Sequence, residues 1–223
     1  MKLVIGNKNY SSWSLRAWLF LTWHGVEFEE ERVPLFEPGY KEKLLAYSGA
    51  GQVPVLLDDE VQVWDSLAIC EYVSEQYLSG RGWPDNVAQR AEARSVSAEM
   101  HAGFSAIRNQ LPMNARALHR QVERNAALTA EIDRIDQLWG DLRSRHHNSG
   151  PWLFGAFSIA DCFYAPMAFR FNTYGVQLSG KAGEYLQSLL EAPAMQQWLK
   201  AAQSEKEVIA MAEAGIAAND GGQ

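Results

Sequence analysis

The sequence predicts two domains of different class: an α/β domain with a small mixed sheet, followed by an all-helical domain. Over residues 1–78, short apolar runs of strand length alternate with helix-like stretches, whereas residues 87–216 carry only helix-period patterns. Residues 79–86 lie between them and begin with Ser79-Gly80-Arg81-Gly82-Trp83-Pro84, a composition typical of a linker.

The first domain is expected to run β-α-β-α-β-β-α, with its elements over residues 3–5, 14–24, 26–33, 40–47, 52–57, 61–64 and 66–77. Gly25 stands where a C-cap glycine ends a helix, and the polar turn Asp58–Glu60 between two apolar runs is typical of a β-hairpin. In the second domain, helical regions are expected over residues 88–118 with a bend near Pro112, and over 121–147, 159–171, 182–191 and 194–202, before a loose tail at 217–223.

Charge and cysteine content limit the classes of function. Twenty basic residues against 27 acidic ones give a net charge of −7, and without a basic run we expect no nucleic-acid partner. Apolar runs are too short for a signal peptide or a membrane span. Two isolated cysteines, Cys70 and Cys162, predict a reducing, cytoplasmic location, and the histidines show no spacing of a metal site.

A serine-rich loop, Asn9-Tyr10-Ser11-Ser12-Trp13-Ser14, leads from the first strand into the first helix. A helix N-terminus carries unpaired N–H groups and a partial positive charge, so it favours an anion. A serine hydroxyl placed there can donate to a thiolate and lower the pKa of the thiol from about 8.5. The alternative is that these serines only cap the helix, because serine is a preferred N-cap residue.

Two further features favour the same kind of ligand. In Gln52-Val53-Pro54, a cis bond before Pro54 would turn the N–H and C=O of Val53 outward to pair with an extended peptide; the alternative is a proline that begins a strand. Asp65 and Ser66 suit an ammonium and a carboxylate, unless they too are only caps. Glutathione combines a thiol, a peptide backbone, an α-ammonium and an α-carboxylate.

The first 78 residues resemble the glutathione-binding domain of the cytosolic glutathione transferases. The resemblance rests on S-S-x-S-x-R, V-P-V-L and D-S-x-A-I-x-E-Y in that order, and the segment Gly155–Asp161 is similar to a helix-start motif of the family's second domain. It implies a thioredoxin-like first domain, glutathione as co-substrate without a metal, and a homodimer. The serine loop is most similar to the serine-type, zeta-like members of bacterial type, although Trp13 replaces the zeta-class cysteine and Tyr47–Gly51 replaces the family's Asn-Pro.

The resemblance assigns roles to individual residues. Ser12 is expected to activate the thiol, with Ser11 as the close alternative and Tyr10 as a third donor. Glutathione is expected to contact Ser11, Ser12, Trp13, Lys43, Gln52, Val53, Pro54, Asp65 and Ser66, with Lys41 as an alternative to Lys43. The electrophile pocket is expected between the domains, beside Tyr10, Trp13, Phe104 and Arg108, with Met100, Phe104 and Ile107 on one helical face. Core packing is the alternative for each pocket residue.

The expected function is detoxification by transfer: a glutathione thiolate, stabilised by a serine hydroxyl and a helix N-terminus, attacks a small hydrophobic electrophile. A glutathione-dependent peroxidase or reductase ranks second, because no cysteine stands at the helix start for mixed-disulfide chemistry. A non-catalytic interaction module of the same fold ranks third. Ser158 and Asp161 are assigned to folding as a capping box.

Overall fold

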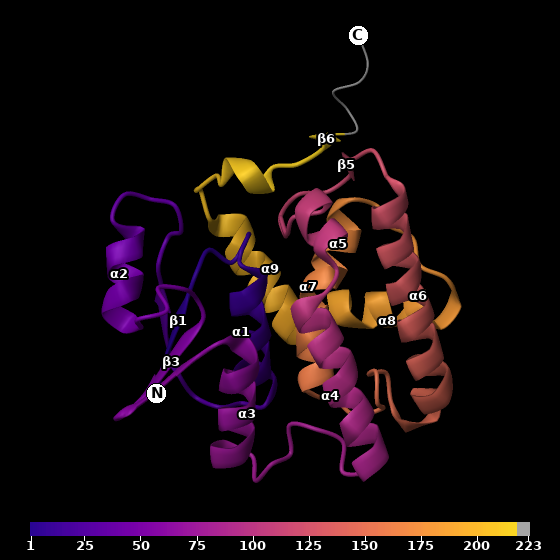
Figure 1. Ribbon diagram of the computed structural model, residues 1–223, viewed down its shortest axis with the longest axis horizontal. Helices are drawn as coiled ribbons and strands as arrows, with labels where there is room; N and C mark the ends of the chain where they lie inside the picture. Colours follow the sequence, from indigo (N-terminus) through magenta and orange to yellow (C-terminus); the bar gives the residue numbers. More distant parts are fainter. Residues whose placement is uncertain (218–223) are drawn as a thin grey trace.

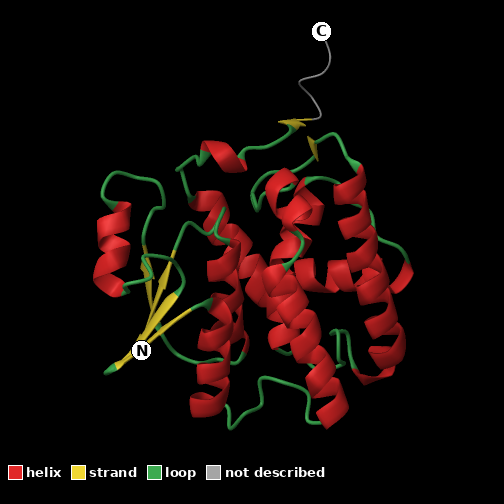
Figure 2. Ribbon diagram, in the orientation of Figure 1, coloured by secondary structure: helices red, strands yellow, loops and turns green. Residues whose placement is uncertain are grey.

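A computed structural model, which describes residues 1–217, confirms the predicted fold class (Figure 1). Figure 2 shows the four-stranded sheet at one side of the molecule and the helices of the second domain at the other. The last element of the first domain ends at Tyr77 and the next helix begins at Val87, so we place the domain linker in the segment between them.

The first domain contains β1 (Lys2–Ile5), α1 (Ser12–Trp23), β2 (Glu29–Arg32), α2 (Tyr40–Tyr47), β3 (Val55–Asp58), β4 (Val61–Trp64) and α3 (Ser66–Tyr77). The strand order is β2-β1-β3-β4, with β1 parallel to β2 and antiparallel to β3, so the predicted β-α-β-α-β-β-α order is confirmed. The predicted strand over residues 26–33 is too long, because the Val26 N–H bonds to the Leu21 carbonyl in the turn that closes α1. Gly25 sits in that turn at φ 65°, as its predicted C-cap role requires.

Helices cover both faces of this sheet. On one face, α2 packs through Leu44 onto a small apolar cluster with Val4, Val33 and Val55. On the other face lie α1 and α3, and Figure 1 shows them between the sheet and the helical domain. The main apolar core runs without interruption from β1 and α1 into the second domain. The two domains therefore share one core, and α1 lies where they meet.

The second domain contains α4 (Val87–Ala102), α5 (Ser105–Gln110), α6 (Ala126–His146), the short 3-10 helix η1 (His147–Ser149), α7 (Ile159–Thr173), α8 (Gly180–Glu191) and α9 (Pro193–Ser204), followed by the 3-10 helix η2 (Ala210–Ala212). Two short strands, β5 (Arg120–Gln121) and β6 (Ile216–Ala217), form an antiparallel pair. The prediction that the second domain contains only helices was therefore wrong at this point. Apart from Ala217, the tail predicted to be loose lies outside the described residues.

The helical region predicted over residues 88–118 is broken earlier than expected. Phe104 adopts a left-handed conformation at φ 59°, which ends α4 and starts α5 in a new direction. The preceding Gly103 passes so close to α4 that an added Cβ would lie 2.8 Å from the Glu99 carbonyl oxygen. Pro112 lies beyond both helices, and Met100 and Phe104 do not share a helical face. The next helix begins at Ala126, later than predicted, because the Asn125 side chain caps it.

Asp161 holds the start of α7, the helix at the centre of the second domain. Its fully buried carboxylate accepts from the Ser158 N–H at 2.9 Å, the Leu153 N–H at 3.0 Å and the Tyr185 hydroxyl at 2.9 Å. The predicted capping box is therefore present and is extended by two partners from outside the helix. This arrangement fixes α7 against the preceding loop and against α8.

Replacing Asp161 by alanine is expected to lower the free energy of unfolding by about 4 kcal/mol, because several buried donors lose their acceptor at once. Urea denaturation measures the loss. Asn86→Ala removes an exposed cap from α4 and is the matched control, with an expected loss of about 1 kcal/mol. Equal losses in the two variants would contradict the role of Asp161.

Candidate active site

A cavity of about 730 Å³ opens at the start of α1, on the side of the sheet edge where β4 meets α3. It is lined by residues 10–13, residues 50–54, residues 64–66, Leu35, Tyr40, Lys41, Leu44 and His101. All three sequence features that favoured glutathione therefore converge on one cavity. His101, from α4, is the lining residue that the second domain contributes.

The two adjacent serines occupy different environments. Ser11 is the N-cap of α1: its Oγ accepts from the Ser14 N–H at 3.3 Å and donates to the Ser14 Oγ at 2.8 Å. Ser12 Oγ instead accepts from Arg170 Nη2 at 3.2 Å, so its own hydroxyl proton is not used in that contact. Both serines line the cavity and are 6% exposed. Ser11 thus caps the helix, whereas the hydroxyl of Ser12 contacts a cation from the second domain.

Tyr10 lines the same cavity, but its hydroxyl is turned toward the C-terminal segment. The hydroxyl donates to Glu213 Oε1 at 2.6 Å and accepts from Arg116 Nη2 at 2.9 Å. Burial and this hydrogen bond raise the pKa of Tyr10, which makes the phenol a weaker proton donor. Its ring contributes to the cavity wall while its polar group is engaged elsewhere.

The other two sequence features that favoured glutathione also line the cavity. The Val53-Pro54 bond is cis, and within residues 1–217 neither the N–H nor the C=O of Val53 has a hydrogen-bond partner. Asp65 caps α3 at the unusual φ of 75°, with Oδ1 accepting from the Leu67 N–H at 2.7 Å. Its Oδ2 lies 3.3 Å from Nε2 of His101. A non-glycine residue held at positive φ in a cavity wall is typical of a functional position.

Ser66 is a lining residue of the cavity and has an unused polar group. Its side chain is fully buried, and in the described part of the chain its Oγ has no hydrogen-bond partner. A buried hydroxyl without a partner costs free energy unless a ligand satisfies it. The position of Ser66 at the N-terminus of α3 adds a partial positive charge, so the group it fits is an anion such as a carboxylate.

Other predicted site residues lie outside the cavity lining. Lys43 is exposed and is not a lining residue, whereas Lys41 lines the cavity and donates from Nζ to the Gly51 carbonyl at 2.8 Å. Phe104 is buried at the α4–α5 junction. Arg108 lies behind the wall, with its guanidinium over the Trp13 ring at 5.0 Å and its donors on the carbonyls of Gly103 and Met100.

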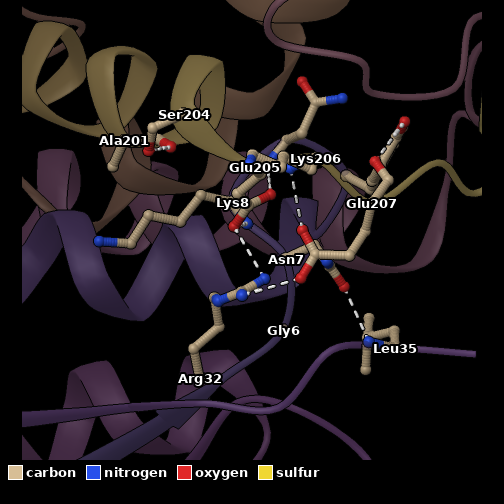
Figure 3. A network of polar contacts seen from close by, with 12 residues as sticks. Gly6, Asn7, Lys8, Arg32, Leu35, Ala201, Ser204, Glu205, Lys206 and Glu207 are labelled. Atoms are coloured by element: carbon tan, nitrogen blue, oxygen red, sulfur yellow. Dashed lines mark hydrogen bonds and ion pairs between the residues drawn. The ribbon is translucent and has the colours of Figure 1, made fainter. Parts of the chain in front are cut away.

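The loop that carries the serines is held by both domains. Asn9 bonds through Nδ2 to Asn114 Oδ1 at 2.8 Å and accepts on its own Oδ1 from the Arg116 N–H at 2.8 Å. Figure 3 shows Glu205, just after α9, reaching the same loop. Its carboxylate accepts from the N–H groups of Lys8 at 2.7 Å and Asn9 at 3.0 Å, and Arg32 lies 3.5 Å from it.

Glu205→Ala is expected to lower the free energy of unfolding by about 3 kcal/mol, because two N–H groups of a buried loop lose their acceptor. The neighbouring Glu207 also pairs with Arg32, at 2.8 Å, but contacts no loop N–H through its side chain. Glu207→Ala is therefore the matched control, with an expected loss below about 1 kcal/mol in the same denaturation experiment. A larger loss from Glu207→Ala would contradict this account.

Sequence reasoning missed two residues that shape the site. Arg170 stands in an otherwise apolar helix, and a lone cation in such a pattern was a signal that something polar had to be met there. Glu205 had no comparable signal, because a glutamate after a helix is ordinary and its partners lie almost two hundred positions earlier in the chain.

Both cysteines lie in the core of the protein. Cys70 and Cys162 are fully buried free thiols, and burial raises the pKa of both well above the ordinary range. Such thiols are poor nucleophiles. Among residues 1–217, no group of three or more His, Cys, Asp or Glu side chains is placed to hold a metal ion. No helix in that range is long and apolar enough to cross a membrane.

Comparison with known proteins agrees with this fold and cavity. The sequence profile for the glutathione S-transferase N-terminal domain matches residues 10–76, and the profile for the C-terminal domain of the same family matches residues 91–201. The two matches together span most of the chain. The chain therefore belongs to the glutathione S-transferase family.

Individual relatives are distant. Glutathione S-transferase GstB of Escherichia coli is 28% identical over 156 residues, covering 68% of this chain and 74% of GstB. A probable maleylacetoacetate isomerase of Caenorhabditis elegans is 26% identical over 76% of this chain and 78% of its own length. Dichloromethane dehalogenase of Methylophilus leisingeri is 35% identical, but only over 29% of this chain and 25% of that enzyme.

Solved structures give the same fold. A glutathione transferase homologue from Burkholderia, solved with bound glutathione, superposes with a TM-score of 0.70 at 24% identity, covering 92% of this chain and 98% of that one. At this identity the likeness establishes the architecture.

Proposed function

We propose that this chain is a serine-type glutathione transferase that holds glutathione in the cavity at the start of α1. The observation that carries the proposal is the set of unused polar groups on the cavity wall: the Ser12 hydroxyl proton, the main chain of Val53 and the buried Oγ of Ser66. These groups match the thiol, the peptide backbone and the α-carboxylate of the tripeptide.

Each of these residues has one task in the proposal. Ser12 donates its hydroxyl proton to the sulfur and favours its anionic form, aided by the N–H groups at the start of α1. Val53 pairs with the extended backbone of the tripeptide, as a strand edge pairs with a peptide. Ser66 and the N-terminus of α3 receive the carboxylate, and Asp65 receives the ammonium. Lys41, which lines the cavity, is the candidate for the glycine end.

The bound thiolate then supplies the nucleophile. The thiol proton leaves to solvent when glutathione binds, and the sulfur forms a bond to an electrophilic carbon of the second substrate as the leaving group departs with its electron pair. In this arrangement the chain needs no general base, because the proton is lost before the chemical step. We expect the electrophile beside Trp13 and His101, where the cavity wall joins the helical domain.

Ser12→Ala is expected to reduce kcat for a chlorinated aromatic electrophile by about tenfold or more, since a hydrogen bond to a charged group contributes about 1.5–3 kcal/mol. Ser11→Ala is the matched control: it removes the α1 cap, so it lowers stability by about 1 kcal/mol with a smaller effect on kcat. An unchanged rate in Ser12→Ala with a large loss in Ser11→Ala would move the role to Ser11. Calorimetry that finds no uptake of glutathione by the folded protein would reject the proposal as a whole.

We also expect a cytoplasmic homodimer, as is usual in this family. Large apolar side chains are exposed on β4, α3 and the start of α4: Val61 at 43%, Tyr77 at 45% and Val87 at 72%. Sedimentation equilibrium should give twice the chain mass of 25.0 kDa. Val61→Glu is expected to shift the protein toward monomer, whereas Val208→Glu, at a valine that is 66% exposed and lies far along the chain after α9, should leave the dimer intact. A monomeric wild-type protein would contradict this expectation.

A further inference from the structure

Three arginines from three different helices converge behind the cavity wall. Arg16 comes from α1, Arg108 from α5 and Arg170 from α7, and the first and last are only 1% and 5% exposed. The guanidinium of Arg16 lies over the Trp13 ring at 4.2 Å, and that of Arg108 lies over the same ring at 5.0 Å. Trp13 therefore separates the open cavity from a buried cluster of positive charge.

Among residues 1–217, none of the three guanidinium groups forms an ion pair; Arg170 donates from Nη1 to the Leu111 carbonyl at 2.5 Å, and Nε and Nη1 of Arg16 meet no acceptor. Burial and the neighbouring cations lower the pKa of Arg16 and of Arg170 to about 9, so both stay protonated at neutral pH. Buried charge without a counter-ion is unfavourable, and an anion placed beside it is correspondingly stabilised.

Arg170 connects this cluster to the reacting end of the cavity. Its Nη2 donates to the Ser12 Oγ at 3.2 Å from the other domain, across the packed α1–α7 interface. The contact occupies a lone pair of the hydroxyl and leaves its proton to point elsewhere. A charged donor also polarises the hydroxyl, which strengthens the bond that the hydroxyl itself donates. Ser11, which has no such neighbour, directs its proton to Ser14.

We propose that Arg170 is a positioning residue of the transferase site: it orients the Ser12 hydroxyl toward the sulfur and, with Arg16 behind Trp13, keeps that sulfur anionic. The proposal rests on the proposed function, because it assumes that the sulfur of glutathione meets Ser12. In this proposal Arg170, a residue of the helical domain, determines which of the two adjacent serines contacts the sulfur. Ser12 contacts the sulfur, and Arg170 acts through Ser12.

Other charged and titratable groups face this region and enter any pH profile. They are Tyr10 before α1, Lys41 in α2, Asp65 and Cys70 at α3, His101 in α4, Arg108 in α5, Glu131 in α6 and Tyr174 after α7. Burial lowers the pKa of His101, and the carboxylate of Asp65 partly opposes this shift. Arg170 differs from all of them in contacting the Ser12 hydroxyl directly.

The test compares Arg170→Met and Arg170→Lys with the wild type. The ultraviolet absorbance of bound thiolate, followed against pH, measures the pKa of the glutathione thiol, and calorimetry measures the affinity. In Arg170→Met the thiolate fraction below that pKa should fall about tenfold, with kcat falling by the same factor and the KM for glutathione little changed. Arg170→Lys keeps the charge and should recover part of the loss.

Arg143→Met is the matched control, because Arg143 is also buried and donates to main-chain carbonyls, those of Trp152 and Gly150, without contacting a serine. It should lose stability but leave the thiol titration unchanged. If Arg170→Met titrates like the wild type and like Arg143→Met, the proposal is overturned. If wild-type protein fails to take up glutathione, the proposed function fails instead.

Arg170→Met leaves main-chain carbonyls in the core without a donor, which destabilises the folded state of this variant. Should it not fold, the pair Ser12→Ala and Ser12→Ala/Arg170→Lys decides the question. Arg170→Lys is expected to shift the pKa of the glutathione thiol when Ser12 is present. In the Ser12→Ala background it is expected to have no further effect. Equal shifts in both backgrounds would show that Arg170 acts independently of Ser12 and would overturn the proposal.

Discussion

The site depends on the burial of α1 between the two domains. One side of this helix packs with α3 against the sheet, and the other side packs on α7 and α9. Its residues are accordingly buried almost all round, including the arginine at position 16. Because α1 is held from both sides, the N–H groups and hydroxyls at its N-terminus occupy fixed positions before any ligand arrives. Such preorganisation is what stabilises a charge effectively in a protein site.

The loop before α1 is likewise held in place by the second domain. The Trp198 indole donates to the Lys8 carbonyl at 2.7 Å, and Asn9 and Glu205 complete a set of contacts from the second domain. A loop of this length, left to itself, would sample many conformations. Here the helical domain supplies the acceptors and donors that select one. The first domain thus provides the candidate catalytic residues, and the second domain provides their positions.

The local charge behind the cavity wall is opposite in sign to the net charge of the chain. The protein carries a net charge of −7, yet the region behind Trp13 holds three guanidinium groups, none of which forms an ion pair within residues 1–217. Burial of these charges is unfavourable, and the packing of α5 and α7 with α1 holds them together. An uncompensated positive region beside a cavity with a free hydroxyl is a suitable environment for an anion, and net charge alone gives no hint of it.

Local patterns were sufficient for most of the first domain. The alternation of short apolar runs, Gly25 after the first helix and Asp65 before the last one each depend on neighbouring residues, and the structure has them where the sequence predicts. The break at Gly103–Phe104 was missed because a left-handed phenylalanine has no local signal; tertiary packing imposes it. The β5–β6 pair was missed because its strands lie about a hundred residues apart.

The sequence by itself determined the fold class, the family likeness and the three segments that line the cavity, because periodicity, capping and turn chemistry are properties of neighbouring residues. Only the tertiary structure decided which serine faces a cation, which lysine lines the cavity and which residues stand behind Trp13. Those outcomes depend on side chains such as Arg170 that meet Ser12 from far along the chain, and no local pattern encodes such a contact.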